Sequence, residues 1–161
     1  MVAIVRQFRS DRPRSPKPAG TTMTDGRLAR QNRTGPPRIL IIEDDPLMAY
    51  LTDNMVFDLG YAVSGIAHTI ALARQELGKR NFEAALLDLA LDGQNSPEIA
   101  DLLQETRTPF ALVSGRNRVF EVRYKNVPLL HQPFTAYQLY VVLERLVGPG
   151  GRMPREMADA S

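Results

Sequence analysis

The sequence predicts an α/β fold in which a doubly wound, five-stranded parallel sheet has the strand order 2-1-3-4-5. Short apolar runs alternate with helical segments along residues 38–147, which is typical of a parallel sheet with helices on both faces. The runs are continuously apolar, which indicates strands that are buried on both sides. Right-handed crossover connections then favour the doubly wound order, in which the first and third strands are neighbours.

The first part of the domain supplies two strands and two helices. Residues 38–43 form an apolar run that predicts the first strand, and Pro46 follows where the first turn of a helix tolerates proline. That helix is expected to end at Gly60, a natural stop. Residues 61–66 predict the second strand, and an amphipathic segment from about 68 to 80 predicts the second helix.

The third strand and the helix after it have clear sequence signals. Residues 83–88 form the third apolar run, which ends on an aspartate. Ser96 is a typical N-cap residue, and it is followed by Pro97 at the first helical position and by Glu98 in the first turn. Residues 110–113 then predict the fourth strand.

The end of the domain is expected to contain one short strand and one long helix. Residues 116–126 are charged and have only a weak helical pattern. Residues 128–130 predict a short fifth strand, and Thr135 is expected to open a last helix that ends at about Val147.

The last helix has more apolar residues than one buried stripe requires. Its core stripe is expected to be Leu139, Val142, Leu143 and Leu146, and further apolar residues around it are Tyr137, Tyr140, Val141 and Val147. Two interpretations remain open. The helix has a wide core face with tolerated exposed tyrosines, or it offers a surface for a homodimer or another partner.

Composition restricts the class of protein. The chain has 161 residues, 43% of them hydrophobic, which suits one ordinary domain, and it has no cysteine and only two histidines. Disulfides, a thiolate nucleophile and a zinc site are therefore not expected. No apolar stretch approaches the length that spans a membrane, and the apolar start is too short for a secretory signal. We expect a cytoplasmic protein without membrane association.

The two ends of the chain differ from the domain between them. Residues 1–36 hold eight basic and two acidic residues, whereas the rest of the chain holds twelve basic and sixteen acidic ones. This basic leader is rich in Pro and Arg, has no periodic apolar face and is expected to be disordered, without specific nucleic-acid binding. An upstream extension is an alternative, because Met23 also makes a plausible start. The folded domain is expected over 37–147, followed by a flexible tail over 148–161.

Acidic residues directly follow two of the buried runs. Glu43, Asp44 and Asp45 come after the first strand, and Asp88 ends the third. Parallel strands that are neighbours bring their carboxyl ends to one edge of the sheet, so we expect these side chains to meet in one crevice. Converging buried carboxylates are costly unless a cation lies between them. The sequence therefore predicts a hard divalent cation, held against one carboxylate that takes part in chemistry.

Four ordered positions resemble the receiver domains of two-component response regulators. The family pattern is an acidic pair after strand one, a phosphoacceptor aspartate after strand three, Ser or Thr after strand four, and Lys-Pro after strand five. Residues 43–45, Asp88 and Ser114 fill the first three positions, and Pro133 fills part of the fourth. The resemblance implies a flavodoxin-like receiver fold.

The amino-acid sequences of three segments indicate one subgroup within the receiver family. Residues 87–93, 96–103 and 109–115 are similar to the FATGUY subgroup of stand-alone receivers. That subgroup has a shortened fourth helix, which agrees with the weak pattern over 116–126.

The resemblance implies a role for each matching residue. Asp88 would be the nucleophile that accepts a phosphoryl group from the phosphohistidine of a sensor histidine kinase. Asp44, Asp45, Asp88 and the backbone carbonyl of Ala90 would hold Mg²⁺, a metal that binds a few carboxylates and bridges phosphoryl oxygens. The metal would neutralise charge during transfer, and Ser114 would donate a hydrogen bond to a phosphoryl oxygen once it is in place.

The chain departs from the family pattern at the lysine position, which Gln132 occupies. A neutral amide still donates a hydrogen bond, but a charge-assisted bond is roughly twice as strong. Leu129 also stands where the family usually has a switch aromatic. We therefore expect phosphorylation to occur while its coupling to a conformational change is weakened or rebuilt.

The expected function is a single-domain response regulator in a phosphorelay, not an enzyme, whose output is partner binding or phosphate flow. The alternative is a pseudo-receiver, a binding module regulated without phosphorylation, which Gln132 and Leu129 favour. An aspartyl phosphohydrolase is disfavoured, because the second aspartate of such enzymes, two residues after the nucleophile, is Ala90 here. The sequence also has no P-loop, G-x-G-x-x-G or G-x-S-x-G motif.

Overall fold

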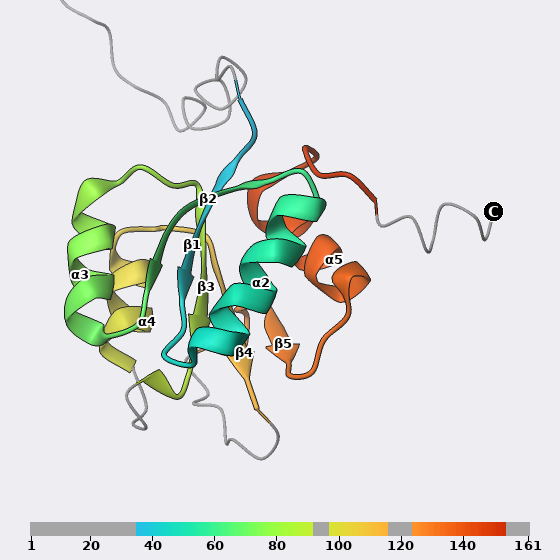
Figure 1. Ribbon diagram of the computed structural model, residues 1–161. Coiled ribbons are helices and arrows are strands. Elements are labelled where there is room, and N and C mark those ends of the chain that lie inside the picture. The colour runs from blue at the N-terminus through green and yellow to red at the C-terminus, as the bar shows by residue number, and fades with distance from the viewer. Residues whose placement is uncertain (1–34, 92–96, 116–123, 154–161) are drawn as a thin grey trace, which may run out of the picture. The chain divides into compact units, whose positions relative to one another are not determined.

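The structure, a computed structural model, describes residues 35–91, 97–115 and 124–153. Its elements in chain order are β1 (Arg38–Ile42), α2 (Pro46–Asp58), β2 (Ala62–Ala67), α3 (Ile70–Lys79), β3 (Ala84–Asp88), α4 (Pro97–Glu105), β4 (Phe110–Ser114), β5 (Leu129–His131) and α5 (Ala136–Val147). Figure 1 shows their arrangement. Most of the expected leader and of the weak helical segment lies outside the described residues, as do Ser96 and the end of the expected tail.

The strands form one parallel sheet in the order β2-β1-β3-β4-β5, which confirms the predicted fold class. β1 pairs with β2 on one side and with β3 on the other, where Ile42 lies opposite Leu87. Every strand begins and ends within one residue of its predicted boundary. The carboxyl ends of β1 and β3 therefore lie side by side.

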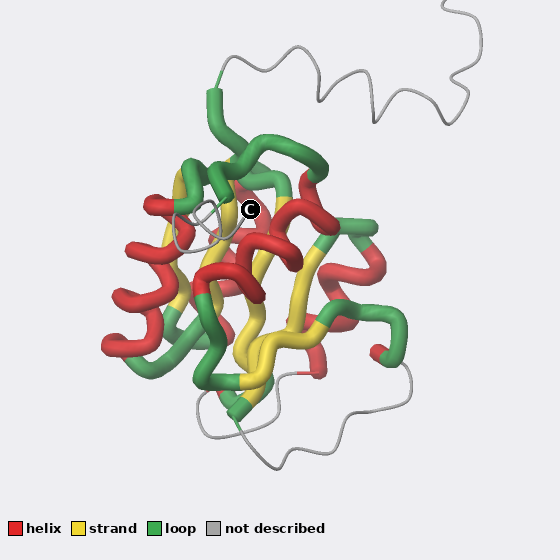
Figure 2. The backbone as a smooth tube through the Cα atoms, turned by 90° about the vertical axis from the view of Figure 1, so that its right-hand side faces the viewer, coloured by secondary structure: helices red, strands yellow, loops and turns green. Residues whose placement is uncertain are grey.

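α2 and α5 cover one face of the sheet, and α3 and α4 cover the other (Figures 1 and 2). On one face, Ile41 packs in a buried cluster with Val56 of α2 and Leu143 of α5. On the other face, Leu40 belongs to a cluster with Leu103 of α4. Because successive side chains of a strand point to opposite faces, the continuous apolar runs of the sequence fill two cores instead of one.

The helix starts follow from side chains that accept backbone hydrogen bonds. Thr69 caps α3 by accepting from the amide of Leu72 at 3.2 Å. Thr135 and Gln138 form a reciprocal capping box at the start of α5, where the sequence predicts the helix to open. Within the described ranges, no helix is long and apolar enough to span a membrane.

Residues 148–153, the C-terminal turn, fold back from α5 onto the domain. Oε1 of Glu144 accepts hydrogen bonds from the hydroxyl of Tyr61 at 2.9 Å and from the amides of Gly150 and Gly151 at 3.1 and 3.0 Å. Burial alone would raise the pKa of Glu144, but these three hydrogen bonds hold it below its usual value. One carboxylate thus ties the C-terminal turn to α5 and to the start of β2.

Gly151 leaves no room for a side chain. A Cβ there would lie 2.6 and 2.7 Å from Cε2 and Cζ of Tyr61. We expect Gly151→Ala to lower the free energy of unfolding by about 1 kcal/mol, near the low end for overpacking, because the turn can shift. Gly78→Ala is the matched control, since nothing lies within 4 Å of its Cβ position. Gly78→Ala should raise the free energy of unfolding by about 0.5–1 kcal/mol, because alanine favours the helix more than glycine does. Urea unfolding measures both, and a Gly151→Ala protein as stable as the wild type would contradict the packing.

Candidate metal centre

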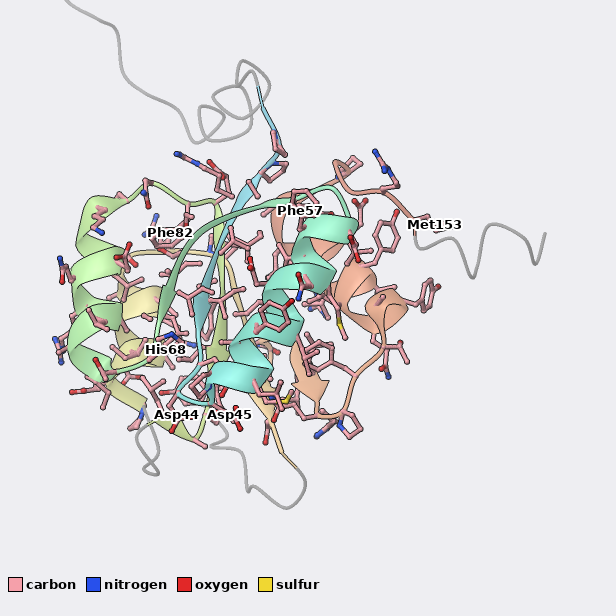
Figure 3. The ribbon with its side chains drawn as sticks, viewed as in Figure 1. Asp44, Asp45, Phe57, His68, Phe82 and Met153 are labelled. Carbon is pink, nitrogen blue, oxygen red and sulfur yellow. The ribbon has the colours of Figure 1, made fainter. Side chains whose placement is uncertain are left out.

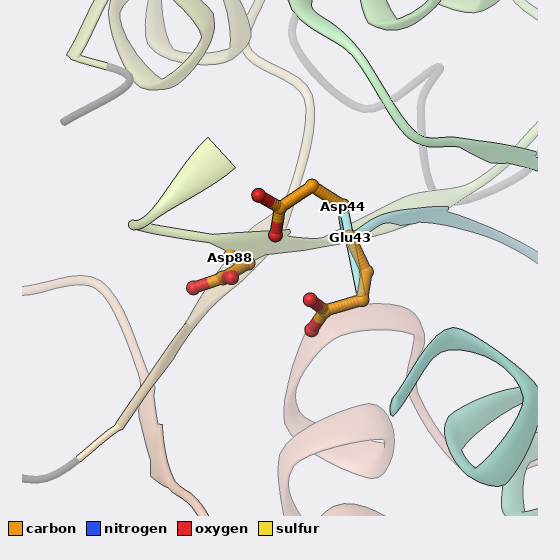
Figure 4. Close-up of side chains that lie close together, drawn as sticks. All are labelled: Glu43, Asp44 and Asp88. Carbon is orange, nitrogen blue, oxygen red and sulfur yellow. The ribbon is translucent and has the colours of Figure 1, made fainter. Parts of the chain in front are cut away.

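Three carboxylates from two neighbouring strands meet at the carboxyl edge of the sheet. Glu43 and Asp44 directly follow β1, and Asp88 is the last residue of β3. Their ligand oxygens all lie within 4.8 Å of one another, and Figure 4 shows the three side chains gathered together. Glu43 and Asp88 are 5% and 6% exposed, whereas Asp44 is half-buried. We call these three residues the acidic cluster.

Asp45, which the sequence analysis expects as a metal ligand, does not belong to the acidic cluster. It is exposed and is the N-cap of α2, where its Oδ1 accepts from the amides of Leu47 at 2.8 Å and Met48 at 3.2 Å. Its carboxylate is engaged with the free amides of the first helical turn. Glu43, two residues nearer the strand, lies with Asp44 and Asp88 instead.

The acidic cluster changes the proton affinity of Glu43. Burial, then the negative charge of Asp88 and a hydrogen bond with it, raise the pKa of Glu43 to about 7, and Asp44 adds to the effect. The amide of Asp45, which donates to Oε1 of Glu43 at 3.1 Å, acts in the opposite direction. At neutral pH the cluster therefore has more negative charge than it stabilises by itself, which is the condition that favours a bound cation.

The raised pKa of Glu43 makes stability depend on pH. The folded protein keeps this proton up to about pH 7 and the unfolded chain loses it near pH 4.5, so the free energy of unfolding falls as pH rises through that window. The Glu43→Gln substitution leaves the side chain at position 43 uncharged across this whole pH window. In metal-free buffer we expect this variant to match the wild type at the acid end of the window and to be more stable above pH 7. Urea unfolding across the window tests this, and a difference that does not change with pH would contradict it.

Gln132 reaches the acidic cluster from the turn after β5. Its Nε2 donates to Oε2 of Glu43 at 3.3 Å, and its backbone amide donates to the carbonyl of Ser114 at 2.8 Å. The position where the family pattern has lysine thus points a neutral donor at a carboxylate of the cluster. The bond joins β5 to the end of β1 across the edge of the sheet.

Ser114 and Ala90 lie at the same edge. Ser114 ends β4 and is 1% exposed, and its hydroxyl donates to the carbonyl of Gly115 at 2.9 Å. The amide of Ala90 donates to Oδ1 of Asp88 at 3.0 Å, which orients the carboxylate. The expected roles of the Ser114 hydroxyl toward a phosphoryl group and of the Ala90 carbonyl toward a metal remain predictions.

His68 also contributes to the site, although its sequence pattern was not interpreted as a site residue. Its Nδ1 lies 2.8 Å from the carbonyl oxygen of Glu43, and because a carbonyl only accepts, Nδ1 carries the hydrogen. Figure 3 shows His68 at the same end of the sheet as Asp44 and Asp45. The bond holds the chain just after β1 in place. The available signal was its position directly after the second predicted strand, at the edge where the carboxylates were expected.

The acidic cluster fits Mg²⁺ by its donor set and its size. Carboxylate oxygens are the ligands that this hard cation prefers, and two oxygens bound at about 2.1 Å lie at most about 4.2 Å apart. The three oxygens within 4.8 Å therefore need only small side-chain movements to share one ion. Glu43, Asp44 and Asp88 are the described side chains that would hold it.

No protein-family model matches the sequence, and no curated protein matches it. Solved structures do match. SdrG from Sphingomonas melonis Fr1 is similar with a TM-score of 0.64 and 28% identity, covering 71% of this chain and 99% of SdrG. A sensor protein from Polaromonas sp. JS666 is similar with a TM-score of 0.60 and 29% identity, covering 69% of this chain and 95% of that protein.

The REC domain of the PhyR response regulator from Erythrobacter litoralis is similar in fold, with a TM-score of 0.58 and 22% identity, covering 72% of this chain and 93% of that domain. Together with the observed strand order, these likenesses show that the chain has the flavodoxin-like receiver fold. The FATGUY likeness remains a prediction.

Proposed function

We propose that the chain is a response regulator receiver that accepts a phosphoryl group on Asp88 from a sensor histidine kinase, in a reaction that requires Mg²⁺. The observation that supports this most is the acidic cluster at the carboxyl edge of a receiver fold. SdrG, at 28% identity, has a BeF3-activated conformation, and this supports a phosphoryl-responsive function for proteins with this fold. Output would be partner binding or phosphate flow.

The proposed transfer needs little covalent chemistry from the protein. A carboxylate oxygen of Asp88 attacks phosphorus in line, the new P–O bond forms, the P–N bond to the donor histidine breaks, and that nitrogen keeps the electron pair and takes up a proton. A bound Mg²⁺ would supply charge neutralisation on the phosphoryl oxygens. The amide of Ala90 holds Asp88 in its orientation, and the hydroxyl of Ser114, which donates to the carbonyl of Gly115, would turn to a phosphoryl oxygen.

A small phosphodonor tests the proposal without a kinase. Incubation with Mg²⁺ and acetyl phosphate is expected to add the mass of one phosphoryl group, detected on the intact protein. Chelation of Mg²⁺ with EDTA should remove the labelling, since the charge on the three carboxylates would then repel the donor. Absence of labelling with several phosphodonors would contradict the proposal.

A second candidate function is a pseudo-receiver that binds partners without phosphorylation. The bond between Gln132 and Glu43 favours it, because a neutral amide replaces the cation that would pair with an acyl phosphate. This candidate predicts that kinase treatment adds nothing to partner binding and that Asp88→Asn leaves binding unchanged. Loss of binding in that variant would exclude it.

α2 offers a surface for the proposed kinase. Leu47, Tyr50, Leu51 and Phe57 are exposed apolar side chains of this helix, and Phe57 is 75% exposed. Figure 3 shows Phe57 at the end of α2 away from Asp44 and Asp45, so Leu47, Tyr50 and Leu51 form the part of this surface nearer the acidic cluster. A donor histidine that reaches Asp88 has to approach over this edge, so its protein would cover the first turns of α2. Exposed apolar residues near a site are typical of partner contacts.

The double substitution Leu47→Ser and Tyr50→Ser is expected to slow phosphotransfer from a kinase about tenfold, because buried apolar anchors dominate interface energies. Labelling by acetyl phosphate should not change, since that donor needs no docking surface. Leu72→Ser is the matched control, an exposed leucine of α3 on the other face of the sheet. An equal loss with both donors, or with the control, would contradict the docking surface.

A homodimer through α5 is the other partner that we propose. Tyr137 and Val141 are exposed on this helix while Leu139 and Leu143 are buried, so an apolar surface is available for a second copy. Sedimentation equilibrium tests it, and a monomer at every protein concentration would exclude it.

A further inference from the structure

A cavity of about 380 Å³ lies at the end of the sheet opposite the acidic cluster. It is open to solvent on one side and is lined by the C-terminal turns of α3 and α4 and by the segments that lead into β3 and β4. Figure 3 shows Phe82, which lines the cavity, far along the sheet from Asp44 and Asp45. Its volume falls within the range of about 300–1,000 Å³ that is typical of small-molecule sites.

Two arginines that line this cavity have a backbone conformation that favours glycine. Arg80 and Arg107 have φ angles of 48° and 53°, and they are the only non-glycine residues with positive φ in the part of the chain that is described. Arg80 caps the end of α3, and Arg107 follows the end of α4. Glycine is the usual residue at such positions, because a Cβ is unfavourable there.

The arginines give the cavity a surplus of positive charge. Among the described ranges, Arg80 and Arg107 form no ion pair, whereas Arg74, which also lines the cavity, pairs with Glu98 at 2.9 Å. Glu83 is the acidic residue of the lining, and it already accepts from the backbone amide of Arg38. Two guanidinium groups without an ion pair to a described residue, those of Arg80 and Arg107, thus stand against one carboxylate.

The end of α4 does not cancel this positive charge. Free carbonyls at a helix C-terminus carry partial negative charge, which would oppose an anion. At α4, however, the carbonyls of Leu102, Leu103 and Gln104 each accept a hydrogen bond from a backbone amide of residues 106–108, at 2.9 to 3.0 Å. The surplus charge in the cavity is therefore available to a ligand.

The remaining lining is apolar, with Leu77, Phe82, Leu102 and Pro109. We propose that this cavity binds a phosphate monoester attached to a flat apolar ring, with Arg80 and Arg107 holding the phosphate. The planar guanidinium groups offer forked donors that match phosphate oxygens. A nucleoside monophosphate has this chemistry. The proposal does not depend on phosphorylation of Asp88.

Adenosine 5′-monophosphate is a suitable probe, added to the full chain carrying Asp88→Asn, in EDTA, so that the acidic cluster contributes nothing. Amide signals of residues around the cavity, such as Phe82 and Leu102, should shift in a saturable manner. Adenosine and inorganic phosphate should each bind at least tenfold more weakly, because adenosine lacks the phosphate group and inorganic phosphate lacks the flat ring.

The double variant Arg80→Gly and Arg107→Gly removes both side chains at positions whose φ angles suit glycine, so it should melt no lower than the parent protein. Its affinity for adenosine 5′-monophosphate is expected to fall at least tenfold. Arg145→Ala, which removes an exposed charge from α5, should leave it unchanged. If the double variant melts lower, the two single variants replace it, each with a partial loss. No binding of the probe, equal binding by the double variant, or inorganic phosphate binding as tightly as the probe would overturn the proposal.

Discussion

Asp88→Asn is expected to abolish labelling by acetyl phosphate completely. The amide has nearly the same size as the carboxylate, and its oxygen can still accept the hydrogen bond that the amide of Ala90 now donates to Oδ1. The fold should therefore persist while the nucleophile is lost. Burial is the main cause of the raised pKa of Glu43 and remains, but the substitution removes the contribution of the Asp88 charge, so the pH dependence of stability should become shallower. Intact-mass measurement of labelling, beside urea unfolding, reads out both effects.

Asp58→Asn is the matched control for this loss. Asp58 is exposed at the far end of α2, and the same change of one carboxylate to an amide there should leave labelling at the wild-type level. Labelling of the Asp88→Asn protein, or a phosphoryl group mapped to Glu43 or Asp44 in the wild type, would contradict the assignment of the acceptor.

Gln132→Lys is expected to raise the free energy of unfolding in EDTA by about 1 kcal/mol, because a charged donor, whose bond is roughly twice as strong, replaces the neutral donor that already reaches Glu43. The new ammonium group would lie where Nε2 of Gln132 is now 3.3 Å from Oε2 of Glu43, beside three carboxylates. It would also lower the pKa of Glu43, because a nearby cation favours the ionised form. With saturating Mg²⁺ the gain should shrink, since the metal already neutralises the same carboxylates.

Gln104→Lys separates this local effect from the added charge itself. Gln104 is exposed on α4, and the substitution there should change stability by less than about 0.5 kcal/mol. Urea unfolding of both variants, with EDTA and with Mg²⁺, makes the comparison. A Gln132→Lys gain that is absent in EDTA, or that persists in full with Mg²⁺, would show that the cluster is not short of positive charge.

The strand order was predictable because local and long-range signals agree. Each buried run is apolar throughout, so the strands can be located without an alternating pattern of apolar and polar residues. Because crossover connections between parallel strands are right-handed, five such strands can be arranged in only a few orders. The opening of α5 at Thr135 was also predictable, since its capping box is a local sequence pattern.

The structure brings Glu43, and not Asp45, together with Asp44 and Asp88, and the expected role of Asp45 as a metal ligand stays a prediction. Three acidic residues follow β1, and the sequence analysis paired Asp44 with Asp45. Pro46 occupies the first turn of α2, so the residue before it becomes the N-cap, and Asp45 is committed to the helix. Glu43 then remains beside Asp88. The Asp-Pro pair was a local signal that could have identified this arrangement.

Other contacts had no local signal. The bond from Gln132 to Glu43 joins residues 89 positions apart, and the bond from Tyr61 to Glu144 joins residues 83 apart. Such contacts depend on the distance between elements in the packed domain, and periodicity carries no information on that distance. The positive φ of Arg80 and Arg107 was hidden for a related reason, because the sequence shows arginine where a helix end usually shows glycine.

A titration with Mg²⁺, followed by the backbone amide signals of the metal-free protein, tests the acidic cluster most directly. The structure predicts saturable shifts at Glu43, Asp44, Asp88 and Ala90, and their loss in an Asp44→Asn protein that remains folded. Amide signals that do not respond to millimolar Mg²⁺, or that respond equally in that variant, would contradict a metal centre at this edge of the sheet.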